Sequence, residues 1–279
     1  MENLTSDYVD MNYVTPIQTI TYIDKKIFLK RDDAFKIGSI CGGKTRVCYF
    51  LSQNSKGLVT AGSRHSPQIN IVAQIAKLLK IPCNAHCPNG ALGEELLCAQ
   101  NAGAQIFQHR AGYNSVIIKR AKDNAIANNF TYIPFGMECQ EAVEQTRKQV
   151  ANLPKECKRI VVTVGSGMSL AGILWGLKDF KLNIPVLGIV VGASPIKRLN
   201  KYAPKDWEKN CVLVKSKLEY DEHSKNCSLE LPNKKLYFDS IYEAKCLPYL
   251  ENNDCFWVIG IRQTENNNII DGQTNEKNS

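Results

Sequence analysis

The chain of 279 residues lacks any apolar run of the roughly 18 residues that a membrane-spanning helix needs. Its opening residues 1–7 lack the basic start and the apolar stretch that are typical of a secretory signal peptide. With 44% hydrophobic and 22% charged residues, the composition is that of a globular chain with room for one large or two ordinary domains. We therefore expect a cytoplasmic protein with no membrane partner.

A metal-binding pattern is also missing. The one cluster of soft ligands covers residues 83–87, where two cysteines flank His86, and no second cluster follows at zinc-like spacing. We therefore expect no metal, and a metal ion at residues 83–87 is the less favoured alternative. The chain has eleven cysteines scattered through apolar segments, which is typical of small buried thiols in a reducing compartment. Examples of such thiols are Cys98, Cys139, Cys211 and Cys255.

The excess of positive charge is moderate, at +8, and its densest stretch covers residues 197–217. A solvated surface explains such a stretch. The alternative is an electrostatic role in attracting a phosphorylated substrate or a nucleic acid.

Strand and helix patterns alternate along the chain. Strands are predicted over 26–30, 57–62, 81–86, 104–108, 159–164 and 186–191, and helices over 47–51, 69–79, 93–103 and 170–177. This alternation predicts an α/β fold with right-handed parallel crossovers. Residues 215–235 are polar and weakly patterned, and the last dozen or so are expected to form a disordered tail.

Lys44 follows two glycines, at the point where a strand and a loop give way to an apolar helix. A lysine amine at a helix start, where backbone donors point outward, is suited to forming a Schiff base with an aldehyde cofactor. A solvated lysine is the ordinary alternative.

A glycine loop follows the apolar strand 159–164. Gly165 and Gly167 allow a tight turn, so that Ser166, Met168 and Ser169 can present backbone N–H groups at the start of the next helix. This arrangement is suited to holding a phosphate, although the loop matches neither a P-loop nor a complete dinucleotide fingerprint. An ordinary glycine turn is the alternative.

Polar residues also follow the strand 57–62, at the end where open α/β sheets bind ligands. The loop 60–70 is suited to binding a carboxylate or a cofactor hydroxyl. It is equally suited to starting a helix, with Ser66 as the N-cap and Pro67 at the first helical position.

Several segments, in one order along nearly the whole chain, resemble pyridoxal-phosphate enzymes of the tryptophan synthase β (fold-type II) superfamily. The nearest branch is that of 1-aminocyclopropane-1-carboxylate deaminase and D-cysteine desulfhydrase. The matching segments are Thr15-Pro16-Ile17, residues 27–33, Gly42-Gly43-Lys44-Thr45-Arg46, the loops 60–70 and 165–169, and residues 237–245.

The resemblance implies roles for these residues. Lys44 would form the internal aldimine with pyridoxal 5'-phosphate and then shuttle the proton at the substrate α-carbon. Residues 165–169 would hold the cofactor phosphate. The loop 63–68 would receive the substrate carboxylate, which makes Ser63, Arg64, Ser66 and Gln68 candidate substrate-binding residues. His65 would act as a general acid or base, or it is simply a hydrogen-bonded loop histidine.

The chain departs from this branch at three places. Residues 195–235 are too short for the extra helices of the branch, and residues 134–139 replace a polar loop, so that Glu138 either meets a substrate amine or caps the next helix. Residues 257–264 replace the segment that places a hydroxyl beside the pyridine nitrogen. No carboxylate is predicted to face that nitrogen, and Arg262 or Gln263 is the candidate instead. The shortened form resembles small proteins encoded by phages and mobile elements.

The resemblance implies two three-layer α/β domains with mostly parallel sheets and the cofactor in the cleft between them. Residues 1–45 would form an N-terminal arm of the large domain, 46–155 the small domain, and 156–279 the remainder of the large domain. The expected activity is that of a pyridoxal-phosphate-dependent lyase or deaminase on an amino acid or amine-bearing derivative, in a homodimer. The alternatives are modification of an amino acid attached to a nucleotide or DNA base, and cofactor binding without catalysis.

Overall fold

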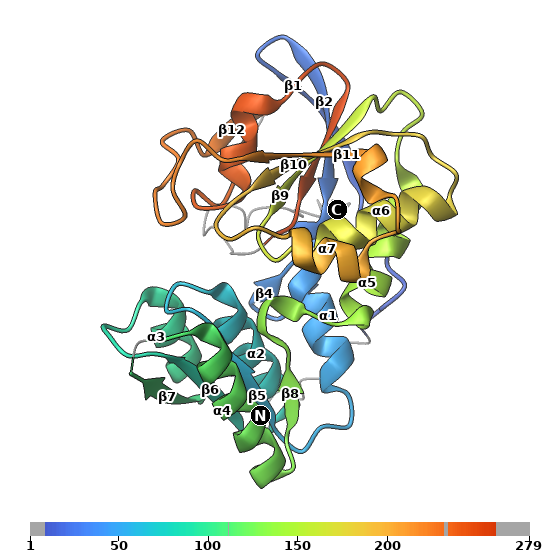
Figure 1. Ribbon diagram of the computed structural model, residues 1–279. Helices are drawn as coiled ribbons and strands as arrows, with labels where there is room; N and C mark the ends of the chain where they lie inside the picture. Colours follow the sequence, from blue (N-terminus) through green and yellow to red (C-terminus); the bar gives the residue numbers. More distant parts are fainter. Residues whose placement is uncertain (1–8, 111, 232–233, 261–279) are drawn as a thin grey trace, which may run out of the picture.

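The computed structural model describes residues 9–110, 112–231 and 234–260. The expected C-terminal tail, with Arg262 and Gln263, lies outside the described residues. Within them, two main sheets lie in separate halves of the molecule, with helices packed around each (Figure 1). The predicted α/β class with mostly parallel sheets is confirmed.

The six-stranded sheet has the order β1-β2-β14-β9-β10-β11, and its pairs are parallel except for the hairpin of β1 and β2. Strand β14, late in the chain, thus lies beside the early strand β2. Strand β9 is buried after its first residue, and apolar there except for Thr163, because both faces of this sheet are covered. The strands are β1 (Ile17–Tyr22), β2 (Lys25–Arg31), β9 (Arg159–Val164), β10 (Val186–Val190), β11 (Cys211–Lys215) and β14 (Asp254–Val258).

The four-stranded sheet has the order β7-β6-β5-β8 and is parallel throughout. Side chains of β5 alternate between its faces: Leu58 joins the core cluster that contains α2, whereas Val59 and Ala61 pack with α4. Helices therefore cover both faces of the sheet. Its strands are β5 (Leu58–Ala61), β6 (Cys83–Pro88), β7 (Gln105–His109) and β8 (Thr131–Ile133).

Helices α1 and α5 lie between the halves (Figure 1). Helix α1 packs on α2 and α5, and α5 packs on α6. The last contact is close because Gly172 has no side chain: a Cβ there would lie 2.5 Å from the Cβ of Thr146. The helices are α1 (Gly43–Ser52), α2 (Pro67–Leu79), α3 (Glu94–Asn101), α4 (Asn114–Asn128), α5 (Gln140–Arg147), α6 (Met168–Asp179) and α7 (Ile196–Tyr202).

Each strand and helix predicted from the pattern is present, but the weakly patterned segment 215–235 also enters a hairpin. Strands β12 (Ser228–Leu231) and β13 (Lys234–Tyr237) pair antiparallel, and the opposed Leu229 and Leu236 are buried against the six-stranded sheet. A further small hairpin joins β3 (Lys36–Ile37) and β4 (Ile40–Cys41).

None of the described helices combines the length and the apolar character that crossing a bilayer requires. All strands of the four-stranded sheet fall within the predicted segment 46–155, and those of the six-stranded sheet fall outside it. The division into domains at residues 45 and 155 stays a prediction.

Candidate functional site

A cavity of about 410 Å³ opens between the two halves, at the carboxyl ends of their parallel strands. Ligands bind at this end of open α/β sheets because the loops that follow the strands converge there. The cavity is lined by segments that follow β5, β8, β9, β10 and β14. Of the residues predicted from the sequence, it brings together Lys44, Ser63, Ser66, Gly165, Ser166, Gly167 and Ser169.

Lys44 lies in the first turn of α1 and is half-buried. The turn before it is held against the end of β14, where the backbone N–H of Gly43 donates to the Ile259 carbonyl at 3.2 Å. Gly42 has φ of +91°, and a side chain there would collide with the Gly260 carbonyl. Gly42 is thus required by this close approach, and Gly43 by another, because a Cβ there would lie 2.7 Å from the Asp32 carboxylate.

A buried ion pair also links the N-terminal end of α1 to the residue after β2. The guanidinium of Arg46 donates to the carboxylate of Asp32 at 2.5 Å, and it also lies over the ring of Phe35, with 4.6 Å to the ring centroid. Both charged side chains are almost fully buried. The pair joins the first turn of α1, which carries Lys44, to the residue that follows β2.

The glycine loop 165–169 connects β9 to α6. Gly167 is the N-cap of α6 with φ of +91°, and a Cβ there would lie 3.0 Å from the Cβ of Pro195. Ser166 and Ser169 line the cavity, whereas the side chain of Met168 is buried in the core. Met168 therefore has only its backbone to offer a ligand.

The loop 60–70 combines a structural and a ligand-facing part. Ser66 caps α2, its hydroxyl accepting from the Gln68 backbone N–H at 3.3 Å, and Pro67 occupies the first turn as predicted. Ser63 and Ser66 also line the cavity. A hydroxyl can cap a helix and still face a ligand, so the predicted cap is present and the ligand-binding role of Ser66 stays a prediction.

The remaining predicted residues lie off the cavity. The side-chain amide of Gln68 is buried and donates to Thr60 and to the Pro134 carbonyl. His65 is exposed, and the guanidinium of Arg64 lies against Gly90. Their roles in substrate binding or catalysis stay predictions.

Glu138 does not cap the following helix, and the alternative that it meets a substrate amine stays a prediction. Its carboxylate accepts from Arg198 Nε at 2.7 Å, and the N-cap of the following helix is Cys139. Arg198 lines the cavity, and Glu138 is not among the described lining residues. Because Glu138 and Arg198 are 60 residues apart in the sequence, no local sequence pattern predicts their ion pair.

Two tyrosines that the sequence analysis did not select also line the cavity. The hydroxyls of Tyr220 and Tyr242 lie 2.8 Å apart, and their rings meet edge to face. Tyr242 falls within the matching segment 237–245, which is the signal that selects it. Tyr220 lies in the weakly patterned segment and has no such signal.

A buried carboxylate lies behind the cavity wall, and the expectation that no carboxylate faces the pyridine nitrogen stays a prediction. Glu243 follows Tyr242, is 1% exposed, and accepts from the Gly260 backbone N–H at 3.0 Å. Its neighbours Tyr242 and Ile259 both line the cavity.

The cluster at residues 83–87 consists of buried thiols and a neutral histidine. Burial raises the pKa of Cys83 to about 12. The guanidinium of Arg120 can only donate to His109 Nδ1, at 2.8 Å, so His109 donates from Nε2 to His86 Nδ1, also at 2.8 Å. Burial, with His109 and Arg120, lowers the pKa of His86 to about 4. Among the described residues, no three His, Cys, Asp or Glu side chains are grouped as a metal site.

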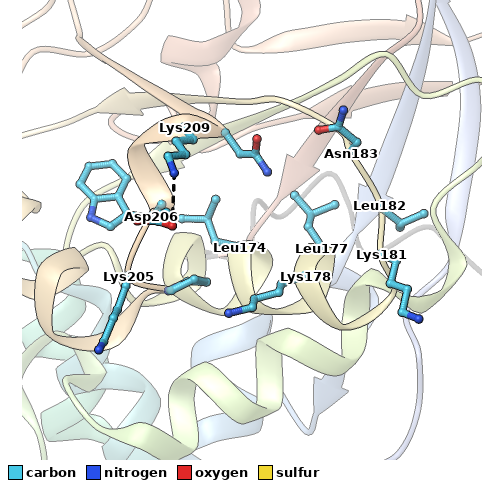
Figure 2. Close-up of a pocket in the computed structure, with 12 residues that line it drawn as sticks. Leu174, Leu177, Lys178, Lys181, Leu182, Asn183, Lys205, Asp206 and Lys209 are labelled. Carbon is cyan, nitrogen blue, oxygen red and sulfur yellow. Dashed lines mark hydrogen bonds and ion pairs between the residues drawn. The ribbon is translucent and has the colours of Figure 1, made fainter.

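The basic stretch 197–217 contributes to a separate hollow of about 370 Å³ near the C-terminal end of α6 (Figure 2). Lysines from two segments line it, with apolar side chains between them, and one lysine is paired with Asp206 at 3.4 Å. The lysines are Lys178, Lys181, Lys205 and Lys209.

A family model described as "Pyridoxal-phosphate dependent enzyme" matches residues 10–214. An ACC deaminase homologue is 20% identical, with a TM-score of 0.73 over 89% of each chain. Diaminopropionate ammonia lyase from Escherichia coli is 12% identical, with a TM-score of 0.62 over 92% of this chain and 84% of that one. Maize serine racemase is 15% identical, with a TM-score of 0.61 over 91% and 89%. No curated protein matches significantly.

Proposed function

The chain belongs to the pyridoxal-phosphate-dependent enzymes, and on that premise we propose that it is a lyase or deaminase acting on an amino acid or amine-bearing derivative. One observation carries this proposal: a single cavity is lined by Lys44, by the glycine loop 165–169 and by the paired hydroxyls of Tyr220 and Tyr242. The cavity therefore combines a primary amine, a phosphate-binding loop and hydroxyls suited to proton transfer.

The cavity suits pyridoxal phosphate in size and in charge. Its volume of about 410 Å³ is within the range of about 300–1,000 Å³ that small-molecule sites occupy. None of its described lining residues is acidic, and two, Lys44 and Arg198, are cationic. The backbone at the start of α6 supplies N–H groups for a phosphate, and Lys44 supplies an amine for an aldehyde.

Residue roles follow from these positions. The bound cofactor would supply an electron sink for bonds broken at the substrate α-carbon. Lys44 would attach the cofactor and move the proton at that carbon. Ser63 and Ser66 would bind the substrate carboxylate through their hydroxyls. Tyr242, hydrogen-bonded to Tyr220, would give a proton to the departing group, and this step makes the enzyme a lyase or deaminase rather than a racemase.

A screen in deuterated water tests the activity. Each amino acid is incubated with the protein and pyridoxal phosphate, and both ammonia release and deuterium at the α-carbon are measured. We expect ammonia release with at least one substrate, lowered about 100-fold by Tyr242→Phe. The matched control is Tyr249→Phe, since Tyr249 ends the short 3-10 helix that Tyr242 begins but lies off the cavity. Deuteration with inversion and no release would indicate a racemase instead, and absence of both would indicate cofactor binding alone.

Modification of an amino acid attached to a nucleotide or DNA base is the second candidate, because the hollow in Figure 2 gathers lysines from two segments. Such binding would be salt-dependent. We expect DNA affinity to fall steeply between low and physiological salt, and to be weakened by the double variant Lys205→Gln, Lys209→Gln. DNA binding that neither salt nor these substitutions change would contradict this candidate. The homodimer stays a prediction, which sedimentation analysis tests.

A further inference from the structure

The charges at the cavity are unbalanced toward the cationic side. Lys44 and Arg198 are the cationic side chains among its described lining residues, and no acidic residue lines it. Lys44 is expected to be occupied with the aldehyde end of the cofactor, where its amine becomes part of a covalent link. The phosphate at the other end carries close to two negative charges, and Arg198 is the described cation left to meet them.

Arg198 lies beside the phosphate loop. It belongs to α7, whose preceding residue Pro195 and whose Leu199 lie within 3.0 and 3.6 Å of the position that a Gly167 Cβ would take. Helix α7 is therefore packed directly on the loop 165–169. The segment after β8 also packs on this loop, because a Cβ at Gly136 would lie 3.0 Å from the Cβ of Ser166.

Glu138 pairs with Arg198 through the Nε atom of the guanidinium only. The carboxylate accepts from Nε at 2.7 Å, and the two terminal Nη groups make no hydrogen bond to any residue that the structure describes. Arg198 is about a quarter exposed and Glu138 about a third, at 27% and 34%. The arginine thus keeps its planar fork of donors for a second anion, in the geometry that suits a phosphate.

We propose that Arg198 is the cationic ligand of the cofactor phosphate and that Glu138 is the positioning residue that orients it. This inference rests on the proposed function, since it requires pyridoxal phosphate in this cavity. Backbone N–H groups orient a phosphate but carry no full charge, and a guanidinium adds charge-assisted hydrogen bonds. Because Glu138 follows β8 of the four-stranded sheet and Arg198 follows β10 of the six-stranded sheet, the phosphate is bound where the two halves meet.

The test compares two cofactor forms that differ only in the phosphate. Dissociation constants of pyridoxal phosphate and of pyridoxal are measured for the full chain by absorbance or fluorescence titration. We expect Arg198→Gln to weaken pyridoxal phosphate by about 10- to 100-fold while pyridoxal changes less than about 3-fold, the loss expected for a charged hydrogen bond. The unchanged affinity for pyridoxal also shows that the variant is folded.

Two further variants test whether the effect is specific to Arg198: one removes a neighbouring charge on α7, and the other removes the partner of Arg198. Lys197→Gln removes an exposed neighbouring charge that does not line the cavity, and it should leave the preference for the phosphate form unchanged. Glu138→Gln keeps the arginine but removes the carboxylate that orients it, so the preference for the phosphate form should fall, by less than in Arg198→Gln. An unchanged preference in Arg198→Gln would overturn the inference and leave the proposed function standing. A loss in Glu138→Gln as large as in Arg198→Gln would also overturn it. Failure of the wild type to bind either form would contradict the proposed function itself.

Discussion

The cavity has two walls of different construction. The wall beside the six-stranded sheet holds Lys44 in place through buried contacts, namely the Arg46–Asp32 ion pair and the approach of Gly42 to Gly260. The wall beside the four-stranded sheet is a loop in which Ser63 and Ser66 face the cavity while the intervening His65 is exposed. The part that would hold the cofactor is therefore fixed by packing. The part that would choose the substrate lies on a loop, where substitutions disturb the fold least.

The largest difference in stability is expected between a buried and an exposed arginine ion pair, those of Arg46 and Arg147. Arg46→Met leaves the Asp32 carboxylate buried without its ion-pair partner, which should lower the free energy of unfolding by about 3–5 kcal/mol. Arg147→Met removes pairs with Glu144 and Asp179 that are about one-third exposed, and this change should cost about 1 kcal/mol or less. Urea unfolding of both variants measures the two losses, and equal losses would contradict the assigned role of the buried pair.

The glycines of the two halves give a second contrast. Gly42 and Gly103 share a similar φ, +91° and +97°, but a Cβ at Gly103 meets nothing within 4 Å. Both alanine variants carry the cost of positive φ, and Gly42→Ala adds a collision with the Gly260 carbonyl. We expect Gly42→Ala to be less stable than Gly103→Ala by about 2–3 kcal/mol. Thermal unfolding compares them, and similar melting temperatures would show that the contact at Gly260 is not tight.

The four-stranded half should be the acid-sensitive one. The pKa of His86 is lowered from 6.5 to about 4 by burial, His109 and Arg120, so the unfolded chain binds a proton before the folded one does. Stability that is complete above pH 6.5 is then lost as the pH falls toward 4, by about 2 kcal/mol between pH 7 and pH 5. Unfolding of the wild type and of His86→Phe at both pH values measures this. An equal pH dependence in both proteins would exclude His86 as its source.

The smallest effect is expected within the loop 60–70. Ser66→Ala removes the N-cap hydrogen bond of α2 and should cost about 1 kcal/mol. Ser63→Ala removes a hydroxyl that lines the same cavity without capping a helix, and a substitution of this kind changes stability by about 0.5 kcal/mol or less. Both variants should weaken substrate binding, whereas only Ser66→Ala should unfold at a lower urea concentration.

The sequence predicted those features that have a local pattern. The apolar strand 159–164, the cap of α2 by Ser66 and Pro67, and the two glycine turns each follow from neighbouring residues, and each is present. The convergence of Lys44 with the loop 165–169 was predicted from the order of segments rather than from any one of them.

The features that sequence analysis missed depend on contacts between distant segments. The Glu138–Arg198 and Tyr220–Tyr242 pairs join residues whose neighbours carry no periodic signal. The contacts of Gln68 were also missed, because burial directs its amide to Thr60 and the Pro134 carbonyl, which lie in other segments. The hairpin of β12 and β13 was hidden because Leu229 and Leu236 are its buried apolar anchors in a polar stretch.

The attachment of the cofactor to Lys44 is tested most directly by locating the modified lysine. The protein is loaded with pyridoxal phosphate and reduced with borohydride, and the modified peptide is identified by mass spectrometry. We predict a visible absorbance band and modification of Lys44 in the wild type and in Lys56→Ala, where an exposed lysine off the cavity is removed. Lys44→Ala should show neither. A colourless wild type, or the same band and a modified lysine elsewhere in Lys44→Ala, would contradict this account.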